Sequence, residues 1–352
     1  MSITISERIG AFIKMGEILR DKKDPHFQSL REAVQQQAVL NPWFLISHMY
    51  YAIDAIAAML EKKKITELQT YYETFPHLDF NKGDTVAVIS AGNIPLAGFH
   101  DFFSVLVSGN RYMGKLSKDD RILLPALAEI LTAIEPGFKS NIEFVDKPVR
   151  FDKIIATGSN NSARYFEYYF GKYPHILRHH RNSFAILSGR ESDEELEALF
   201  DDIFLYFGLG CRSVSALFVP ENYSFEKLIG VWNRKGKEIA VHHRYLNNLD
   251  YQKTVHLMNS IPYLDAGIAL LIEKMQLASP IGIIYYQYYQ DVEQIKKFME
   301  KEKEHIQCVV SADDRIPDTI PFGKSQQPDI TDHADGVDVI AWLAGDQQQE
   351  KN

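Results

Sequence analysis

An alternation of short apolar strands and helices between residues 83 and 157 constrains the fold of this chain more than any other feature. TVAVIS (Thr85–Ser90) is rich in β-branched residues, which suits a strand buried on both faces. The alternation continues through two helices, Phe99–Val107 and Leu123–Ile134, and three strands, Arg111–Ser117, Asn141–Val145 and Lys153–Thr157. This βαβαβ order predicts a parallel, doubly wound sheet whose ligand binds at the carboxyl ends of the strands.

The length of 352 residues predicts two α/β domains, because a single hydrophobic core rarely grows this large. We expect residues 1–82 to be a helical part of the first domain and residues 83–185 to carry its sheet. A second domain is expected at 186–320. Residues 321–352 would form a tail with a candidate oligomerisation strand, VDVIAWL (Val337–Leu343).

Other elements are predicted from apolar spacing and from capping residues. Asn41 and Pro42 indicate the cap and first turn of a helix that runs from Trp43 to Leu60. In the second domain we expect two helices, Asp193–Phe207 and Asp291–His305, and strands at Gly282–Tyr286 and Cys308–Ser311.

Composition and charge exclude several classes of protein. Hydrophobic residues make up 45% of the chain and charged residues 24%, which indicates a globular protein. A net charge of -9 argues against a nucleic-acid binder, which needs an excess of Lys and Arg. The N-terminal sequence does not resemble a secretory signal, and no apolar run is long enough for a bilayer. We therefore expect a cytoplasmic protein without stable membrane insertion.

The two cysteines of the chain have different surroundings. Cys211 follows Gly208-Leu209-Gly210, where a glycine turn meets the start of a new element, and backbone N–H groups at such a start favour a thiolate. Spacing alone favours the alternative, in which Cys211 is a small buried residue packed beside a helix end. Cys308 lies in the apolar run IQCVVSA and is expected to be such a packing residue, whose replacement by Ala leaves turnover near normal. Two cysteines form no disulfide framework. Because His242 and His243 have no further metal ligand at suitable spacing, no metal is expected.

Four segments in a fixed order resemble the aldehyde-dehydrogenase superfamily. GLGCRSVSALFVP (Gly208–Pro220) resembles its catalytic-cysteine segment. The other three are ISAGNIPLAGF (Ile89–Phe99), SGNRYMGKLSKDD (Ser108–Asp120) and IIATGSNNSARYF (Ile154–Phe166). NPWF from Asn41 and the tail PFGKSQQPDITDHADGVD (Pro321–Asp338) are similar to the acyl-CoA reductase branch, which includes the fatty-acid reductase component that supplies aldehyde to bacterial luciferase. The resemblance implies a doubly wound cofactor domain and a second α/β catalytic domain.

The resemblance also implies roles for single residues. Cys211 would be the nucleophile, and Asn93 would donate to the oxyanion, although Asn93 is also a plausible turn or cap residue. Lys115 would grip the adenosine ribose, or it could simply extend to solvent from a strand end. NAD-selective relatives often carry Glu three residues later, where this chain has Lys118; a cation there favours NADPH.

The remaining candidates follow from looser parts of the resemblance. Gly158 and Ser159 would support the cofactor pyrophosphate at a helix start. Gln276 would take the place of a glutamate that holds the nicotinamide ribose.

The segment LRHHR (Leu177–Arg181) departs from the hydrolytic members of the superfamily. Those enzymes carry there a glutamate that activates water, and this chain has Arg178, His179 and His180 instead. A reductase must protect its thioester from water, so the missing base favours reduction. Some of these residues could bind CoA or cofactor phosphates, and His179 or His180 could donate a proton; alternatively, the segment could be a solvated basic strand end.

The resemblance therefore implies an enzyme that reduces an acyl-CoA to the aldehyde with NADPH through an acyl-cysteine. A homo-oligomer is also expected by resemblance. Two alternatives stay open: a reductase of another activated acyl group, such as an acyl phosphate or acyl carrier protein, and a non-catalytic NADPH-binding subunit.

Overall fold

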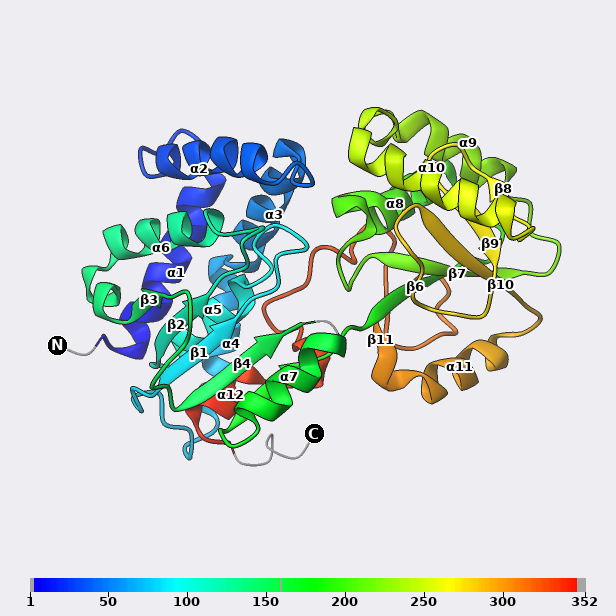
Figure 1. Ribbon diagram of the computed structural model, residues 1–352. Helices are drawn as coiled ribbons and strands as arrows, with labels where there is room; N and C mark the ends of the chain where they lie inside the picture. The colour runs from blue at the N-terminus through cyan, green and yellow to red at the C-terminus, as the bar shows by residue number, and fades with distance from the viewer. Residues whose placement is uncertain (1–2, 159, 347–352) are drawn as a thin grey trace. The chain divides into compact units, whose positions relative to one another are not determined.

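The chain folds into two compact units, each built around its own sheet (Figure 1). The computed structural model describes residues 3–158 and 160–346. Unit 1 comprises Met1–His180 and Pro328–Asn352, and unit 2 comprises Arg181–Gln327. The C-terminal residues thus return to unit 1 instead of forming a separate tail from residue 321. The first crossing between the units lies at His180–Arg181, before the expected boundary at 185–186.

Unit 1 contains a five-stranded, wholly parallel sheet in the order β3-β2-β1-β4-β5, which confirms the predicted doubly wound sheet. Its strands are β1 (Thr85–Ile89), β2 (Arg111–Lys115), β3 (Ile142–Phe144), β4 (Lys153–Thr157) and β5 (His175–Arg178). They are linked by α5 (Phe99–Val107), α6 (Leu123–Ile134) and α7 (Asn160–Phe170). Because crossovers between parallel strands are right-handed, α5 and α6 cover one face and α7 the other (Figure 1).

Four N-terminal helices complete this unit: α1 (Ile5–Arg20), α2 (Phe27–Leu40), α3 (Ile46–Met59) and α4 (Lys62–Glu73). A capping box between Thr4 and Glu7 starts α1. The ring of Phe12 packs edge-on against Phe103, with ring centroids 4.8 Å apart, and so joins α1 to α5. The expected helix start at Asn41 and Pro42 is wrong. Asn41 is the C-cap of α2, and its side chain accepts from the Trp43 N–H (3.1 Å), which delays the next helix to Ile46.

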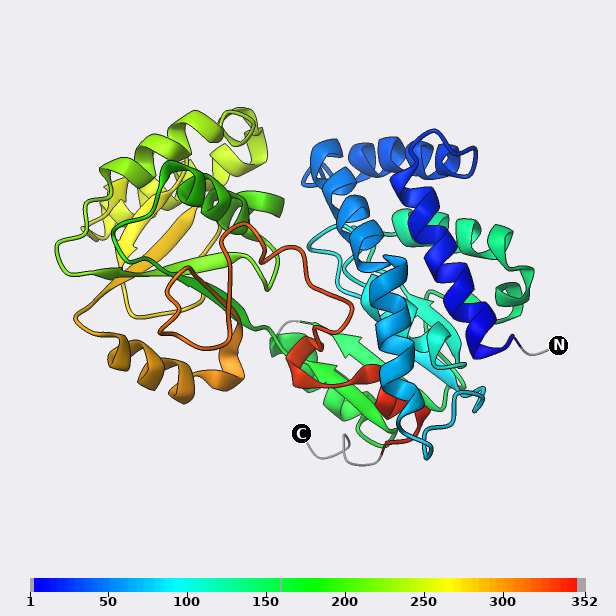
Figure 2. The same cartoon turned by 180° about the vertical axis from the view of Figure 1, so that it is seen from behind.

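The segment VDVIAWL is a buried helix of unit 1, α12 (Val339–Ala344), and not the expected strand. Asp338 caps it by accepting from the Ala341 N–H (2.9 Å), and Gly345 ends it in a left-handed conformation. The Tyr72 hydroxyl of α4 donates to the same Asp338 carboxylate (2.7 Å), so α12 lies beside α4 (Figure 2). These local bonds favour a helix despite the apolar, strand-like composition.

Unit 2 contains a seven-stranded sheet in the order β12-β11-β6-β7-β10-β9-β8, in which only β8 runs antiparallel to its neighbour. The strands are β6 (Asn182–Ile186), β7 (Val214–Pro220), β8 (Leu264–Asp265), β9 (Leu270–Glu273), β10 (Ile283–Tyr289), β11 (Ile306–Ser311) and β12 (Thr319–Ile320). The helices are α8 (Asp193–Phe204), α9 (Glu226–Lys235), α10 (His243–Met258) and α11 (Val292–Lys301). Unit 2 also contains three short 3-10 helices, η2 (Leu205–Gly208), η3 (Ile239–Val241) and η4 (Lys303–His305), and unit 1 contains η1 (Pro136–Ser140) and η5 (Ala334–Gly336).

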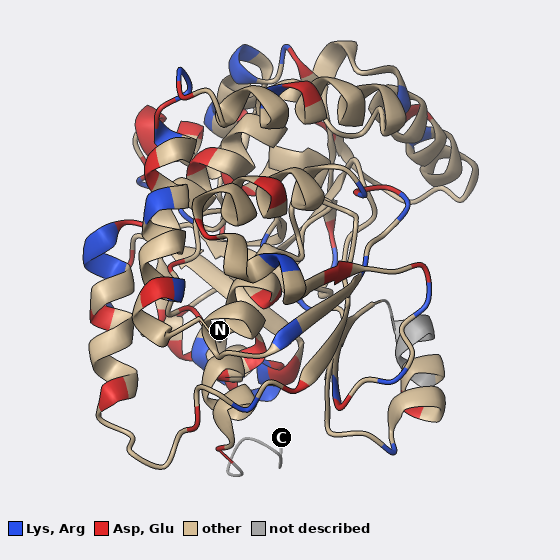
Figure 3. Ribbon diagram, turned by 90° about the vertical axis from the view of Figure 1, so that its left-hand side faces the viewer, with Lys and Arg blue, Asp and Glu red and all other residues tan. Residues whose placement is uncertain are grey.

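Charges of both signs are interspersed along the helices that face the viewer in Figure 3. This pattern agrees with an excess of acidic over basic residues that is modest, 47 against 38. Within residues 3–158 and 160–346, no helix combines the length and the apolar character needed to span a membrane.

Candidate active site

Cys211 lies on a turn at the amino edge of the unit 2 sheet, three residues before β7 begins. The turn is closed by a bond from the Ser213 N–H to the Gly210 carbonyl (3.0 Å). The cysteine is half-buried, whereas Cys308 is only 7% exposed. This exposure fits a reacting thiol for Cys211 and the expected packing role for Cys308.

The backbone that leads into this turn is left-handed at two bulky residues. Tyr206 and Phe207 have φ angles of 56° and 57°, a conformation that costs side chains with a Cβ roughly 1–2 kcal/mol each. Burial offsets this cost, since the Phe207 ring lies 4.3 Å from that of His242 and 5.6 Å from that of Tyr245, centroid to centroid. Because of this bend, α8 ends at Phe204 and not at the expected Phe207. Strain of this kind is concentrated at functional sites.

Ser183, which the sequence did not single out, joins both cysteines of the chain. Its hydroxyl donates to the Cys211 carbonyl (2.9 Å), lies 3.1 Å from the Cys308 sulfur and accepts from the Cys308 N–H (3.2 Å). Ser183 is fully buried at the start of β6, beside the start of β7 in the sheet. Nothing in the local sequence distinguishes this serine, because the pairing of β6 with β7 and β11 creates the contact.

The carboxyl edge of the unit 1 sheet brings together three of the predicted cofactor residues, Lys115, Lys118 and Gly158. Ile89, the last residue of β1, pairs with Lys115, the last residue of β2. Lys118 follows in the exposed loop, and Gly158 follows β4, where its N–H points to the Arg178 carbonyl (3.4 Å). Strand order reverses between β1 and β4, which is where doubly wound sheets bind dinucleotides. Ser159 lies outside the described residues.

The loops after β1 and β2 are held together. A Cβ on Gly92 would lie 2.3 Å from the Ser117 Cβ, so only glycine permits this approach. The Asp120 carboxylate accepts from the Leu96 N–H (2.7 Å), and Leu96 has a φ of 59°. Asp120 is 5% exposed, and burial raises its pKa to about 7 against the lowering effect of the Leu96 bond.

The loop after β2 is also held by residues at the C-terminal end of α2. The carbonyl of Asp119 accepts from the side-chain amides of Gln37 (2.8 Å) and Asn41 (3.2 Å). Asn93 is exposed on the loop after β1. Its exposed position fits both interpretations of the sequence, a turn residue and an oxyanion donor.

Arg178 forms a buried bidentate ion pair with Asp101 of α5. Its two terminal nitrogens lie 2.6 and 2.8 Å from the carboxylate oxygens, and the side chains are 10% and 5% exposed. The pair joins the end of β5 to α5, so the guanidinium is already neutralised inside unit 1. Substrate phosphate binding by Arg178, as expected from the sequence, is therefore disfavoured. His179 and His180 are exposed and remain candidates.

Gln276 lies in unit 2, on the exposed loop between β9 and β10. With Lys274, Phe218 and Tyr286 it lines a narrow cavity of about 10 Å³ on the face of the sheet. The next residue, Leu277, accepts through its carbonyl from the Ser215 hydroxyl (2.5 Å), four residues beyond Cys211. The loop of Gln276 is thus fastened to the strand that follows the cysteine turn.

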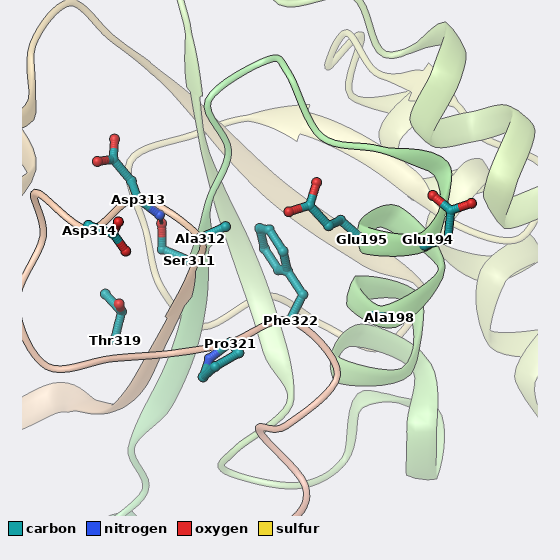
Figure 4. Close-up of a pocket in the computed structure, with 10 residues that line it drawn as sticks. All are labelled: Glu194, Glu195, Ala198, Ser311, Ala312, Asp313, Asp314, Thr319, Pro321 and Phe322. Atoms are coloured by element: carbon teal, nitrogen blue, oxygen red, sulfur yellow. Dashed lines mark hydrogen bonds between the residues drawn. The ribbon is translucent and has the colours of Figure 1, made fainter.

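A larger cavity, of about 460 Å³, lies at the opposite, carboxyl edge of the unit 2 sheet (Figure 4). It is bounded by the first turn of α8, the end of β11 and Phe322. Four carboxylates line it, from Glu194, Glu195, Asp313 and Asp314. Because Cys211 lies at the amino edge, this cavity is not the site of the cysteine. Among the described residues, no cluster of His, Cys, Asp or Glu could hold a metal ion.

No protein-family model matches the chain, and no curated protein matches it in sequence. Its fold is similar to solved aldehyde dehydrogenases. For an NAD-dependent benzaldehyde dehydrogenase from Corynebacterium glutamicum, the TM-score is 0.62 at 14% identity, over 89% of this chain and 77% of the other. Aldehyde dehydrogenase 21 from Physcomitrella patens, solved with its product succinate, gives 0.61 at 14%, over 89% and 75%. The NAD⁺ complex of an aldehyde dehydrogenase from Bacillus cereus gives 0.61 at 14%, over 89% and 73%. The predicted aldehyde-dehydrogenase-like fold is confirmed.

Proposed function

We propose that this protein is an NADPH-dependent reductase that converts an acyl-CoA thioester to the aldehyde, with Cys211 as the nucleophile. One observation carries the proposal: within an aldehyde-dehydrogenase-like fold, a strained left-handed bend presents a half-exposed cysteine at the edge of the sheet. Proteins retain such strain where a fixed geometry has a use.

Unit 1 supplies all but one of the residues proposed to hold NADPH. Lys115 at the end of β2 would bind the adenosine ribose, and Lys118 would attract the 2′-phosphate. Gly158 and Ser159 precede α7, whose N-terminus favours the pyrophosphate. Gln276 of unit 2 would bind the nicotinamide ribose. The tight contact at Gly92 fits this use, because it keeps the two loops that carry Asn93 and Lys118 in one arrangement. Bound NADPH supplies the hydride that reduces the acyl carbon.

In the proposed reaction, the Cys211 thiolate attacks the thioester carbonyl, and CoA leaves as its thiolate. Asn93 and the Cys211 N–H would donate to the oxyanion, which is the main electrostatic contribution expected at such a site. Thioester exchange is nearly balanced in energy, so positioning matters more than a strong base. After hydride addition to the acyl group on Cys211, the C–S bond breaks, and the aldehyde and the Cys211 thiolate form. His179 or His180 would supply any proton required.

The pairing of Arg178 with Asp101 favours reduction over oxidation to an acid. Hydrolytic relatives carry their water-activating glutamate in the stretch that this chain fills with Arg178, His179 and His180. An arginine engaged in a buried ion pair cannot accept a proton from water, so an acyl-cysteine formed here would lack that route to hydrolysis.

The test is incubation with NADPH and acyl-CoAs of graded chain length, following the loss of nicotinamide absorbance and the appearance of aldehyde. We expect turnover with wild type and none with Cys211→Ala, which should keep its melting temperature and its NADPH binding. Aldehyde formation by Cys211→Ala would refute the proposal. Trapping of a radiolabelled acyl group on Cys211 from acyl-CoA, but not from acyl phosphate, would identify the substrate class.

A further inference from the structure

A segment near the end of unit 2, Phe322–Gln327, runs along α8 to the cysteine turn; we call it the strap. It begins beside Ala198, where a Cβ on Gly323 would lie 3.0 Å from the Ala198 Cβ, in close packing. It ends beside Ser213, whose hydroxyl accepts from the Gln326 side-chain amide (3.2 Å). Ser325 and Gln326 are buried, at 0% and 7% exposure.

Asp202 of α8 fixes the middle of the strap. Its two carboxylate oxygens accept from the N–H groups of Gly323 (2.6 Å) and Ser325 (2.9 Å). Asp202 is 1% exposed, and burial raises its pKa, although the bonds to the strap oppose this effect. A buried carboxylate is costly unless it is well bonded, so these two N–H groups account for its presence in the helix.

The strap is also bonded to the residue after Cys211. The Arg212 guanidinium donates through Nε to the Ser325 carbonyl. Ser325 is thus held on one side by Asp202 through its N–H and on the other by Arg212 through its carbonyl. This chain of contacts leads from the interior of α8 to the cysteine turn in two steps.

Both ends of unit 2 therefore contact the same turn. Ser183, two residues after the unit begins at Arg181, bonds to the Cys211 carbonyl. Ser325 and Gln326, just before the unit ends at Gln327, bond to Arg212 and Ser213. The turn is fixed from two directions, which is the kind of support that a reacting group needs to keep its geometry.

We propose that Asp202 is a positioning residue, which through the strap fixes the Cys211 turn in the geometry that lets the thiol react with a bound acyl group. The proposal rests on the proposed function for the nature of the reaction. Asp202 itself touches neither substrate nor cofactor. Its contribution is orientation, which has a large effect on reactions between bound groups. A turn released from the strap would also expose the Cys211 sulfur more often to a small reagent in solution.

The test compares Asp202→Ala, which removes both acceptors, with Asp202→Asn, which keeps one. Asp201→Ala is the matched control, because Asp201 precedes Asp202 on the same helix but pairs with Lys235 (2.6 Å) and not with the strap. Two rates are measured for each variant: alkylation of Cys211 by iodoacetamide, read by peptide mass, and reduction of acyl-CoA. Melting temperatures establish that each variant folds. Gln326→Ala, which loses the bond to Ser213, is the second probe if Asp202→Ala does not fold.

We expect the two rates to change in opposite directions. In Asp202→Ala a freed turn should speed alkylation by at least about threefold, while kcat falls by about tenfold or more with the KM for NADPH unchanged. Asp202→Asn should lie between this variant and wild type, and Asp201→Ala should match wild type. An alkylation rate within about twofold of wild type in Asp202→Ala, or in Gln326→Ala where the former does not fold, would overturn the proposal. If wild type reduces no acyl-CoA but the alkylation rates still differ, the proposed function fails and the positioning by Asp202 stands.

Discussion

The hydroxyl of Ser183 donates to the backbone carbonyl of Cys211 across 2.9 Å, although the two residues are 28 positions apart in the chain. The same oxygen lies 3.1 Å from the sulfur of Cys308. The candidate nucleophile and the buried cysteine therefore share one partner. Removing that partner should affect the geometry of the turn without changing any group that reacts.

Ser183→Ala should lower kcat of the proposed reaction by about fivefold to tenfold, since loss of one buried hydrogen bond costs about 1 kcal/mol or slightly more. Cys308→Ala should lower kcat less, by about twofold, because it removes only the contact with the Ser183 oxygen. Steady-state rates measured with each variant check both values. Because Cys308 contacts Ser183, its replacement is expected to have a small effect on turnover, whereas the sequence alone predicts nearly none. Ser224→Ala, at an exposed position before α9, is the neutral reference, and a Ser183→Ala enzyme as fast as this reference would show that the bond is dispensable.

Arg178→Ala should destabilise the protein by about 3–5 kcal/mol, because it leaves the buried Asp101 carboxylate without its partner. Urea unfolding gives this value. Arg181→Ala is the comparison, since its ion pair with the exposed Glu304 is long, at 3.9 Å, and should contribute about 1 kcal/mol or less. If instead Arg178→Ala kept its stability and raised the KM for acyl-CoA, the arginine would be a substrate ligand after all.

Asp120 makes stability depend on pH. Its folded-state pKa of about 7 lies above the usual 3.8, so the folded state binds more protons than the unfolded state between these values. Stability should therefore fall as the pH rises from about 4 to about 7, by on the order of 3 kcal/mol from this group. Asp120→Asn keeps an oxygen for the Leu96 N–H but cannot ionise.

The measurement is urea unfolding of wild type and Asp120→Asn at about pH 4.5 and about pH 8. Asp120→Asn should be more stable than wild type at the higher pH and about as stable as wild type at the lower pH. Asp119→Asn, at an exposed neighbouring position, should follow wild type at both. A gap between wild type and Asp120→Asn that does not widen with pH would mean that this carboxyl does not titrate near neutrality.

Lys118→Glu should change the cofactor preference. A carboxylate at this exposed position would repel a 2′-phosphate and could accept from a ribose hydroxyl. We expect the KM for NADPH to rise by about tenfold or more while the KM for NADH stays level or falls. Lys139→Glu makes the same charge change in η1, away from the carboxyl edge of the sheet. It should leave the preference for NADPH over NADH unchanged. Equal effects of both substitutions would point to net charge and not to a phosphate contact.

The periodicity of the sequence determined the first sheet and its helices. The bounds of α5, α6 and β4 follow the expected ranges because their apolar runs are bounded by turn residues and their hydrogen bonds are local or repeat along neighbouring strands. The glycine turn at Cys211 could also be predicted from the sequence. The burial of Asp202 was harder to predict. Asp202 lies three residues after the buried Leu199, on the apolar side of α8, but its acidic neighbours suggest a solvated face.

Tertiary structure alone decided how the candidate residues are held. The left-handed Phe207 packs against the rings of His242 and Tyr245, which lie far along the chain. The ion pair of Arg178 with Asp101 and the strap on Asp202 join segments separated by 77 and more than 120 residues. Sequence patterns report which residues are apolar within one turn or strand. They do not show which distant backbone groups will bond to a buried charge, because those groups come together only once the sheets have formed.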